Sequence, residues 1–299
     1  MLYTVSMKIL SLFDGISCAR VALERAGIPV EAYYASEIDK YAIQIGKKNW
    51  EHKNPLSHYL HIGDVKDVSH KKFIMEWDYP KYSIDLLIGG SPCQNLSAAG
   101  NGLGLDGEES KLFYEYIRIL KETNPTYFIL ENVASMKPEQ RDKISEVIGV
   151  QPIMINANLV SAQDRKRYFW TNIPNITQPA DKGIFLRNII TTEGKDITDR
   201  MNKKVVGTLA HKKTWGNVRN LNQKSKTLTK AGQGIANTGA TNIKLDDGTY
   251  KIPTEIECER LQGLPDNYTE GVSSTQRYAV LGNAFNVDVV AHILSFIPR

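Results

Sequence analysis

Residues 85–97 read D-L-L-I-G-G-S-P-C-Q-N-L-S, and this stretch decides the fold. Residues 85–88 form a short apolar run that ends at two glycines, a pattern typical of a buried parallel strand. The glycines allow the chain to turn sharply, and Pro92 then fixes one backbone angle. Cys93 is therefore predicted on a stiff loop beyond the carboxyl end of a strand, where open α/β sheets bind their ligands. A small buried structural cysteine is the alternative.

The composition is that of an ordinary globular protein. The 299 residues suffice for one large domain or for a large and a small one, and 41% are hydrophobic. No apolar run reaches the length of a membrane span, and Lys8 interrupts the first apolar stretch, so we expect no membrane segment and no secretory signal. Because Cys18, Cys93 and Cys258 are widely spaced, we expect no disulfide, no metal site and a cytoplasmic protein.

The positive charge of the chain is unevenly distributed. Residues 171–250 hold 13 Lys and Arg against 6 Asp and Glu, a net charge of +7, whereas the whole chain carries +4. A basic segment attached to a near-neutral body favours a polyanionic partner. A basic surface that is merely solvated is the alternative, and composition alone does not separate the two.

Strands and helices alternate through the first half of the chain. Short apolar runs predict strands that end near residues 12, 35, 63, 88, 130 and 156. The segments between them predict helices at 19–26, 39–49, 69–77, 110–123 and 138–148. This alternation indicates an α/β fold with a mostly parallel sheet.

Polar or conformationally special residues follow five of these strands. Because parallel strands end at one edge of a sheet, we expect these residues to gather there: Gly15, Glu37, Asp64, Cys93 and Glu131. The first unit, strand, Gly15 turn, helix, strand and Glu37, follows the logic of dinucleotide sites, in which the acid binds a ribose hydroxyl. Only part of the G-x-G-x-x-G pattern is present, so this unit alone also fits a plain strand-to-helix turn.

The character of the sequence changes after Trp170. Apolar runs become short, and Asn, Thr, Lys and Gly dominate up to about residue 250, which is typical of a small, loop-rich domain. A short helix is predicted at 256–264, and residues 278–296 are predicted to return as one long helix against the first domain. We therefore expect a catalytic and cofactor-binding domain at 1–170 plus 276–299 and a small recognition domain at 171–275.

Eight motifs appear together in one order. They are F-D-G at 13–15, Glu37, D-V at 64–65, G-G-S-P-C-Q at 89–94, E-N-V at 131–133, Q-D-R-K-R-Y-F-W at 163–170, E-R-L-Q-G-L-P-D-N-Y at 259–268 and G-N-A-F-N-V at 282–287. On these motifs the chain resembles the DNA (cytosine-5) methyltransferases, most closely the de novo subgroup and its bacterial and phage relatives. Ser17 stands where the family usually has a second glycine.

The resemblance implies the catalytic residues. A cysteine thiolate, here Cys93, adds to C6 of cytosine and makes C5 nucleophilic. Glu131 then hydrogen bonds to N3, and Arg165 holds the base carbonyl with Arg167 in support. Since Cys93 cannot reach a base inside a duplex, the target base must be flipped out.

The resemblance also implies the cofactor, S-adenosylmethionine, in a Rossmann-like fold. Glu37 is expected at the ribose, Asp64 and Val65 at the adenine, Phe13 on its ring and Gly15 beside the methionine portion. The full set of expected cofactor residues is Phe13, Gly15, Ser17, Glu37, Asp64, Val65, Pro92, Leu112, Asn283 and Ala284.

Double-stranded DNA is the expected partner of a monomeric, bacterial or phage-encoded protein, with a cognate restriction endonuclease as one setting. Expected DNA contacts are Gln94, Gln163, Arg167, Lys203, Lys204, Lys212 and Lys213; for Gln163, organisation of its own loop is the alternative role. Three alternatives stay open: the same chemistry on transfer RNA, a catalytically silent DNA-binding homologue, and an unrelated cysteine hydrolase. The hydrolase is disfavoured because no histidine lies in the Cys93 loop or in the Glu131 motif to act as its base.

Overall fold

The computed structural model describes residues 6–51, 58–69, 83–92, 111–202, 217–230 and 241–298. The predicted helix at 69–77 therefore falls almost wholly outside the described residues. The same holds for these predicted site residues: Cys93, Gln94, Lys203, Lys204, Lys212 and Lys213.

The chain splits into two compact units. The first, which we call the sheet unit, comprises Met1–Ile155, Lys166–Gln178 and Val290–Arg299. The second unit comprises Asn156–Arg165 and Pro179–Val289. Residues 156–165 and 276–289 thus lie with the second unit in this division. The expected domain boundaries, 1–170 plus 276–299 against 171–275, stay a prediction.

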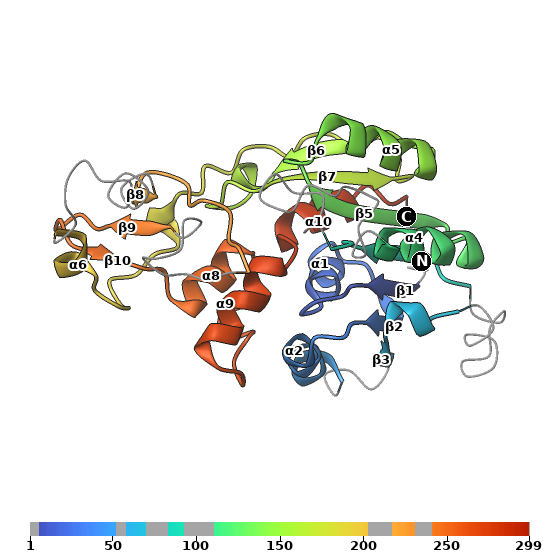
Figure 1. Ribbon diagram of the computed structural model, residues 1–299, viewed down its shortest axis with the longest axis horizontal. Helices are drawn as coiled ribbons and strands as arrows, with labels where there is room; N and C mark the ends of the chain where they lie inside the picture. Colours follow the sequence, from blue (N-terminus) through green and yellow to red (C-terminus); the bar gives the residue numbers. More distant parts are fainter. Residues whose placement is uncertain are drawn as a thin grey trace, which may run out of the picture. The chain divides into compact units, whose positions relative to one another are not determined.

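A seven-stranded sheet forms the sheet unit, in the order β3-β2-β1-β4-β5-β7-β6 (Figure 1). Its strands are β1 (Met7–Leu12), β2 (Val30–Ser36), β3 (His58–Gly63), β4 (Leu86–Gly89), β5 (Tyr127–Val133), β6 (Ile153–Asn156) and β7 (Lys166–Thr171). The first five pair in parallel, and β7 runs antiparallel to β5. The mostly parallel, Rossmann-like α/β fold predicted from the sequence is confirmed.

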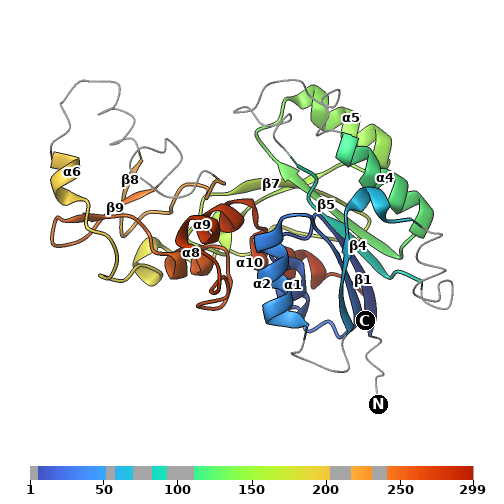
Figure 2. The ribbon, with the colours of Figure 1, turned by 60° about the horizontal axis from the view of Figure 1, so that its bottom comes forward.

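Helices cover both faces of this sheet. Helices α1 (Cys18–Arg25) and α2 (Lys40–Trp50) lie on one face, and α4 (Lys111–Thr123) and α5 (Pro138–Ile148) lie on the other (Figures 1 and 2). The apolar side chains Phe113, Tyr116 and Ile119 of α4 are buried, because they recur at helical spacing and face the sheet. Burial on both faces explains why β4, with the sequence L-L-I-G, is fully buried.

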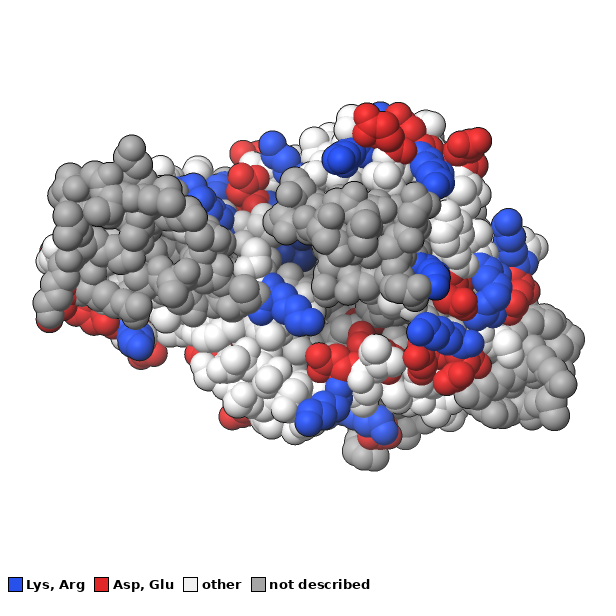
Figure 3. All heavy atoms as spheres, viewed as in Figure 1, with Lys and Arg blue, Asp and Glu red and all other residues white. Residues whose placement is uncertain are grey.

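The outer surface of these helices carries mixed charge. On the face drawn in Figure 3, Lys and Arg lie among Asp and Glu over α4 and α5. On α4, Arg118 pairs with Glu115 and Glu122, and on α5 Arg141 pairs with Asp142. These alternating charges agree with the near-neutral character that the sequence gives to this part of the chain.

Two elements differ from the sequence-based expectation. Glu131 does not follow β5 but lies within it, because the strand continues to Val133 by pairing with β7. The long helix predicted at 278–296 is two helices, α9 (Ser274–Asn283) and α10 (Val287–Leu294). It breaks between them because the Ala284 carbonyl accepts a hydrogen bond from a side chain, and the Asn286 side chain accepts from the Val289 amide.

The second unit contains a small three-stranded sheet and short helices. The strands β8 (Val218–Asn220), β9 (Asn242–Lys244) and β10 (Tyr250–Lys251) are ordered β10-β9-β8, and α6 (Thr198–Asn202) and α8 (Glu255–Leu261) precede and follow them. A small core forms around Ile197, Met201 and Tyr250. Among the described residues, no helix has both the length and the apolar character needed to cross a membrane.

Candidate functional site

The ends of β1, β2 and β3 are tied together at the carboxyl edge of the sheet. The Gly15 amide donates to Oε2 of Glu37 over 2.8 Å, and the other oxygen of this carboxylate accepts from the amides of Ile38 and Asp39. The Glu37 amide donates to the Gly63 carbonyl over 3.1 Å, directly before Asp64. The structure thus brings together Gly15, Glu37 and Asp64, as the parallel topology predicts.

The turn after β3 is built around Asp64 and Val65. Asp64 accepts a hydrogen bond from the Lys66 amide and so starts the short helix η1 (Val65–Asp67). The Arg118 guanidinium of α4 donates to the carbonyls of Val65 and Val68 over 3.3 and 2.8 Å. This arginine therefore holds the turn against the sheet.

Apolar residues of the predicted cofactor set line the same region. Val65 is buried in the core cluster, and the partly buried Phe13 and Leu112 pack against that cluster. Ile38, which the sequence analysis did not single out, is 70% exposed directly after Glu37. This exposed apolar side chain lies next to the carboxylate that the sequence assigns to the cofactor, so it is a candidate for contact with the same ligand. The sequence feature that could have drawn attention to Ile38 is its position directly after Glu37, the acid at the end of a strand.

Asp14, in the turn that follows β1, carries a buried carboxylate that was not predicted as a site residue from the sequence. Its oxygens accept hydrogen bonds from the hydroxyls of Ser11 and Ser17, each over 2.6 Å, and of Tyr33 over 2.5 Å. Burial raises the pKa of Asp14 from 3.8 to about 6; the three hydroxyl donors oppose this shift, and the Glu37 charge adds to it.

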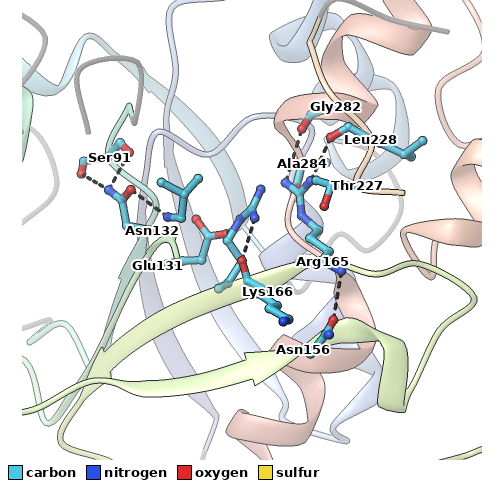
Figure 4. A network of polar contacts seen from close by, with 12 residues as sticks. Ser91, Glu131, Asn132, Asn156, Arg165, Lys166, Thr227, Leu228, Gly282 and Ala284 are labelled. Atoms are coloured by element: carbon cyan, nitrogen blue, oxygen red, sulfur yellow. Dashed lines mark hydrogen bonds and ion pairs between the residues drawn. The ribbon is translucent and has the colours of Figure 1, made fainter. Parts of the chain in front are cut away.

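Asn132 of the E-N-V motif anchors the chain that leads from β4 to Cys93. Its buried amide nitrogen donates to the Ser91 carbonyl over 3.3 Å and to the Ser91 hydroxyl over 3.2 Å (Figure 4). Ser91 is buried, and Pro92 follows it as the last described residue before Cys93. The predicted nucleophile thus leaves the sheet from a backbone that the neighbouring strand holds in place.

Glu131 and Arg167 form an ion pair on the antiparallel strands β5 and β7. Glu131 lies opposite Phe169 and Arg167 lies opposite Val133, so the two charged residues are diagonal neighbours on one face. Nε of Arg167 lies 2.8 Å from Oε1 of Glu131, and their side chains are only 15% and 13% exposed. Arg167, expected in support of Arg165, therefore contacts the predicted catalytic acid directly.

Arg165 has a different environment, within the second unit. Its buried guanidinium donates to three backbone carbonyls, those of Leu228, Gly282 and Ala284, over 3.1, 3.3 and 2.8 Å (Figure 4). These bonds fix two segments that are far apart in the sequence. The expected contact between Arg165 and the base carbonyl finds no support in this geometry, because the guanidinium is occupied by the chain itself.

Gln163 is likewise enclosed by the second unit. The side chain is fully buried; its amide nitrogen donates to the Leu261 carbonyl and to Gln262, and its oxygen accepts from the Leu228 amide. The expected DNA contact of Gln163 is therefore not supported, since its polar atoms bond to the protein. The bonds agree with the alternative role expected for Gln163, which is to organise its loop.

The last motif forms the turn after α9. Asn283 is exposed, and Ala284 is buried. Gly282 must be a glycine here, because a Cβ atom would overlap the backbone of Thr229 and Lys230. The segment 225–230 and this turn are thus in direct contact within the second unit.

The fold and the residues at its edge define a Rossmann-like methyltransferase, and the comparison with protein families specifies the kind. The family model described as C-5 cytosine-specific DNA methylase matches residues 7–176 and 182–299. The chain therefore belongs to the DNA cytosine-5 methyltransferases, and S-adenosylmethionine is its methyl donor. The recognition made from the eight sequence motifs is confirmed.

Relatives of known kind span nearly the whole chain. A type II methyltransferase of Fusobacterium nucleatum is 30% identical over 97% of this chain and 93% of its own length. A type II methyltransferase of Neisseria gonorrhoeae is 28% identical over 98% and 96%. An orphan methyltransferase of Bacillus phage rho11s is 39% identical over 44% of this chain and 24% of its own length.

Solved structures show the same fold. Spodoptera frugiperda DNMT2, crystallised as a mutant, superposes with a TM-score of 0.70 at 19% identity, covering 97% of this chain and 99% of the other. A putative DNA modification methyltransferase encoded within an Escherichia coli prophage gives a TM-score of 0.68 at 18% identity, covering 97% and 98%.

Proposed function

We propose that this enzyme methylates C5 of cytosine in duplex DNA through a covalent adduct of Cys93. The thiolate adds to C6, the ring electrons move to C5, and C5 attacks the sulfonium methyl group, so that the sulfur departs as a neutral thioether. Loss of the C5 proton and release of the thiolate from C6 then restore the aromatic ring. The observation that supports this proposal is the arrangement of β4 and β5. Gly89 at the end of β4 pairs with Leu130 of β5. The segment that leads to Cys93 therefore begins next to Glu131, which lies on the adjacent strand.

Glu131 and Arg167 are assigned to the two polar groups of the base. Glu131 faces N3, where electron density accumulates when the thiolate adds, and a proton held between its carboxyl group and N3 stabilises that form of the ring. Arg167 takes the base carbonyl in place of Arg165, because its guanidinium already lies against Glu131. A guanidinium paired with a carboxylate retains further N–H donors, so it can bind the base without breaking the ion pair.

The carboxyl edge of β1 to β3 is assigned to the cofactor. Bound S-adenosylmethionine supplies an electrophilic methyl group on sulfur. Three of the roughly four acceptor positions of the Glu37 carboxylate are used by amides, which leaves one for a ribose hydroxyl. Ile38 covers one face of the adenine ring, while Asp64 and Val65 meet its edge, and Phe13 packs nearby.

Duplex DNA presents its bases stacked, so the target cytosine is flipped out of the helix to meet Cys93. The protein acts as a monomer, and the basic segment 171–250 holds the DNA backbone. A type II restriction setting, with a cognate endonuclease, is the biological context that the relatives from Fusobacterium and Neisseria favour.

The test compares Cys93→Ser with wild type. Serine keeps the size of the side chain but is a far weaker nucleophile, so methyl transfer to duplex DNA is expected to fall by at least about a thousandfold with unchanged cofactor affinity. Bisulfite sequencing of methylated duplexes, together with methyl incorporation into transfer RNA, identifies the substrate. The matched control is Cys258→Ala, because that side chain is fully buried and burial raises the pKa of its thiol. Full turnover by Cys93→Ser would rule out the covalent route.

A further inference from the structure

We propose that Asp14 and Ser17 are positioning residues that hold the turn 13–17 in the shape that receives S-adenosylmethionine. The inference rests on the proposed function, which places the cofactor at this turn. The new element is that the backbone of this turn is strained at Ser17, and that a buried hydrogen-bond network stabilises it where a glycine would need no such support.

The backbone of this turn is unusual. Phe13, Gly15 and Ser17 all adopt left-handed conformations, with φ angles of 53°, 59° and 60°. Glycine adopts this conformation freely, whereas a residue with a Cβ atom resists it. Ser17 must hold it at the position directly before α1 begins. Some interaction must therefore compensate for the strain at Ser17.

The compensating interaction is the hydroxyl of Ser17. It donates to Oδ2 of Asp14 over 2.6 Å and lies 2.9 Å from the Tyr59 hydroxyl of β3. The Ser17 amide also donates to the Asp14 carbonyl over 3.1 Å, which closes the turn through its backbone. Ser17 is fully buried, so its side chain acts on the turn and not on solvent.

Asp14 is fixed in turn by two strands. Ser11 of β1 and Tyr33 of β2 both donate to its other oxygen, and the rings of Tyr33 and Tyr59 stack with centroids 5.6 Å apart. Its amide donates to the Ser36 carbonyl over 3.0 Å. The carboxylate thus joins β1, β2 and the turn into one hydrogen-bonded unit.

Helix α2 leaves no room for this network to shift. A Cβ atom on Gly46 would lie 2.5 Å from the Tyr59 hydroxyl and 2.9 Å from Oγ of Ser17. The absence of a side chain at Gly46 therefore makes the space in which the two hydroxyls meet. The network is therefore packed closely against α2.

The network acts on the cofactor edge because Gly15 lies between its two anchors. The Gly15 amide bonds to Glu37, the residue assigned to the ribose. If Ser17 relaxes out of the left-handed conformation, the Gly15 amide turns away and Glu37 loses a bond that orients it. Cofactor affinity should therefore follow the conformation of Ser17.

The test contrasts Ser17→Ala with Ser17→Gly. Both variants remove the hydroxyl, but only glycine tolerates the left-handed backbone. Titration calorimetry with S-adenosylhomocysteine is expected to show at least about fivefold weaker binding for Ser17→Ala and a change below about twofold for Ser17→Gly. Asn175→Ala is the matched control. Asn175 has the same φ of 60°, but lies in the exposed loop after β7, at the opposite edge of the sheet.

A double-mutant cycle tests the role of Asp14. If Asp14 acts through Ser17, Asp14→Asn should weaken binding at least about threefold in wild type and less than twofold in the Ser17→Gly background. Equal affinities of Ser17→Ala and Ser17→Gly would overturn the proposal, whether both were weak or both unchanged. Failure of the wild type itself to bind S-adenosylhomocysteine would instead overturn the cofactor assignment of this edge.

Discussion

Two turns that the sequence motifs assign to the cofactor are held in opposite ways. In the sheet unit, the turn 13–17 is held by carboxylates: Asp14 and Glu37 accept hydrogen bonds from hydroxyls and amides. In the second unit, the turn 282–284 is held by donors: Arg165 donates to the carbonyls of Gly282 and Ala284, and Gln262 donates to the carbonyl of Leu281. The first arrangement keeps Glu37 partly exposed beside the ligand edge, whereas the second buries Arg165 among the protein's own carbonyls.

The difference teaches how a charged motif residue is to be interpreted. A charge that keeps unused hydrogen-bonding capacity at a surface is available to a ligand, and a buried charge whose donors meet backbone carbonyls serves the framework. Arg165 and Arg167 are two residues apart in one motif, yet Arg165 donates to backbone carbonyls whereas Arg167 pairs with Glu131. The distinction can be tested by substitutions in each turn.

The largest effects are expected from the two arginines. Arg165→Ala leaves three buried carbonyls without their donor and should lower the free energy of unfolding by about 3 to 5 kcal/mol. Arg167→Ala leaves the largely buried Glu131 carboxylate without its partner and should cost about 1 to 3 kcal/mol of stability. It should in addition lower kcat by about a hundredfold or more, because it removes the group proposed to bind the base carbonyl. Urea denaturation and single-turnover methylation measure the two effects. A stable but inactive Arg165→Ala would reverse the assignment.

The next effect concerns Asp14 and pH. Because the pKa of Asp14 is raised from 3.8 to about 6, the folded protein keeps a proton between these values that the unfolded chain has released. Stability is therefore highest below pH 3.8 as far as this group is concerned, and about 3 kcal/mol is lost as the pH rises to about 6. Asp14→Asn lacks this titration.

Denaturation of wild type and Asp14→Asn at pH 4 and pH 7 checks this expectation. The wild type should lose about 2 kcal/mol more than the variant between the two pH values, because the unfolded chain is already partly ionised at Asp14 at pH 4 and all other groups cancel in the comparison. Parallel pH profiles of the two proteins would show that Asp14 does not titrate in this range. The turn 282–284 offers no counterpart, because an arginine does not titrate there.

Glu37 should show a smaller effect, confined to ligand binding. Glu37→Ala is expected to weaken S-adenosylmethionine binding by about 1 to 3 kcal/mol, the range for losing hydrogen bonds to a charged group. Calorimetry measures the change, and Glu31→Ala is a control on the same strand, where the side chain pairs with Lys8 near the strand's beginning. Unchanged affinity of Glu37→Ala would remove this carboxylate from the cofactor site.

Sequence periodicity predicted most of the first half of the fold because the central strands β1 and β4 are almost fully buried and so appear as apolar runs. The runs that end at Leu12, Ser36 and Gly89 are apolar and bounded by turn residues, so their limits are visible in the sequence. The break between α9 and α10 was not predictable, because it depends on bonds to Arg165 and Asn286 that form only in the folded chain.

The site residues also divide into those whose position follows from the topology and those whose role depends on contacts in the folded chain. Gly15, Glu37 and Asp64 were predictable as neighbours because parallel topology alone places them at one edge. Asp14 was missed because a carboxylate with three hydroxyl donors is indistinguishable in sequence from a solvated one. The different surroundings of Arg165 and Arg167 could not be predicted for a similar reason: their spacing does not reveal which guanidinium meets backbone carbonyls and which pairs with Glu131.

The smallest effect is expected from the basic segment 171–250, and it concerns the salt dependence of DNA binding. Lys203, Lys204, Lys212 and Lys213 are predicted to bind phosphates, and removing each lysine that does so should flatten the dependence of log affinity on log salt by about one unit. We expect a change of about one to three units for the variant with all four lysines neutralised, with similar reductions in affinity for specific and unrelated duplexes.

Lys224 provides the matched control, because the structure already commits its ammonium group. It donates to the carbonyls of Asn158, Ser161 and Ile184, and burial lowers its pKa. Lys224→Gln should therefore reduce stability and leave the salt slope unchanged, as expected for a framework residue like Arg165. If the four-lysine variant has the wild-type slope, the basic excess is a solvated surface and DNA is held elsewhere. If Lys224→Gln alone flattens the salt dependence, a lysine that donates to backbone carbonyls also binds phosphate. In that case, hydrogen bonds to backbone carbonyls would not distinguish framework residues from ligand-binding residues in this unit.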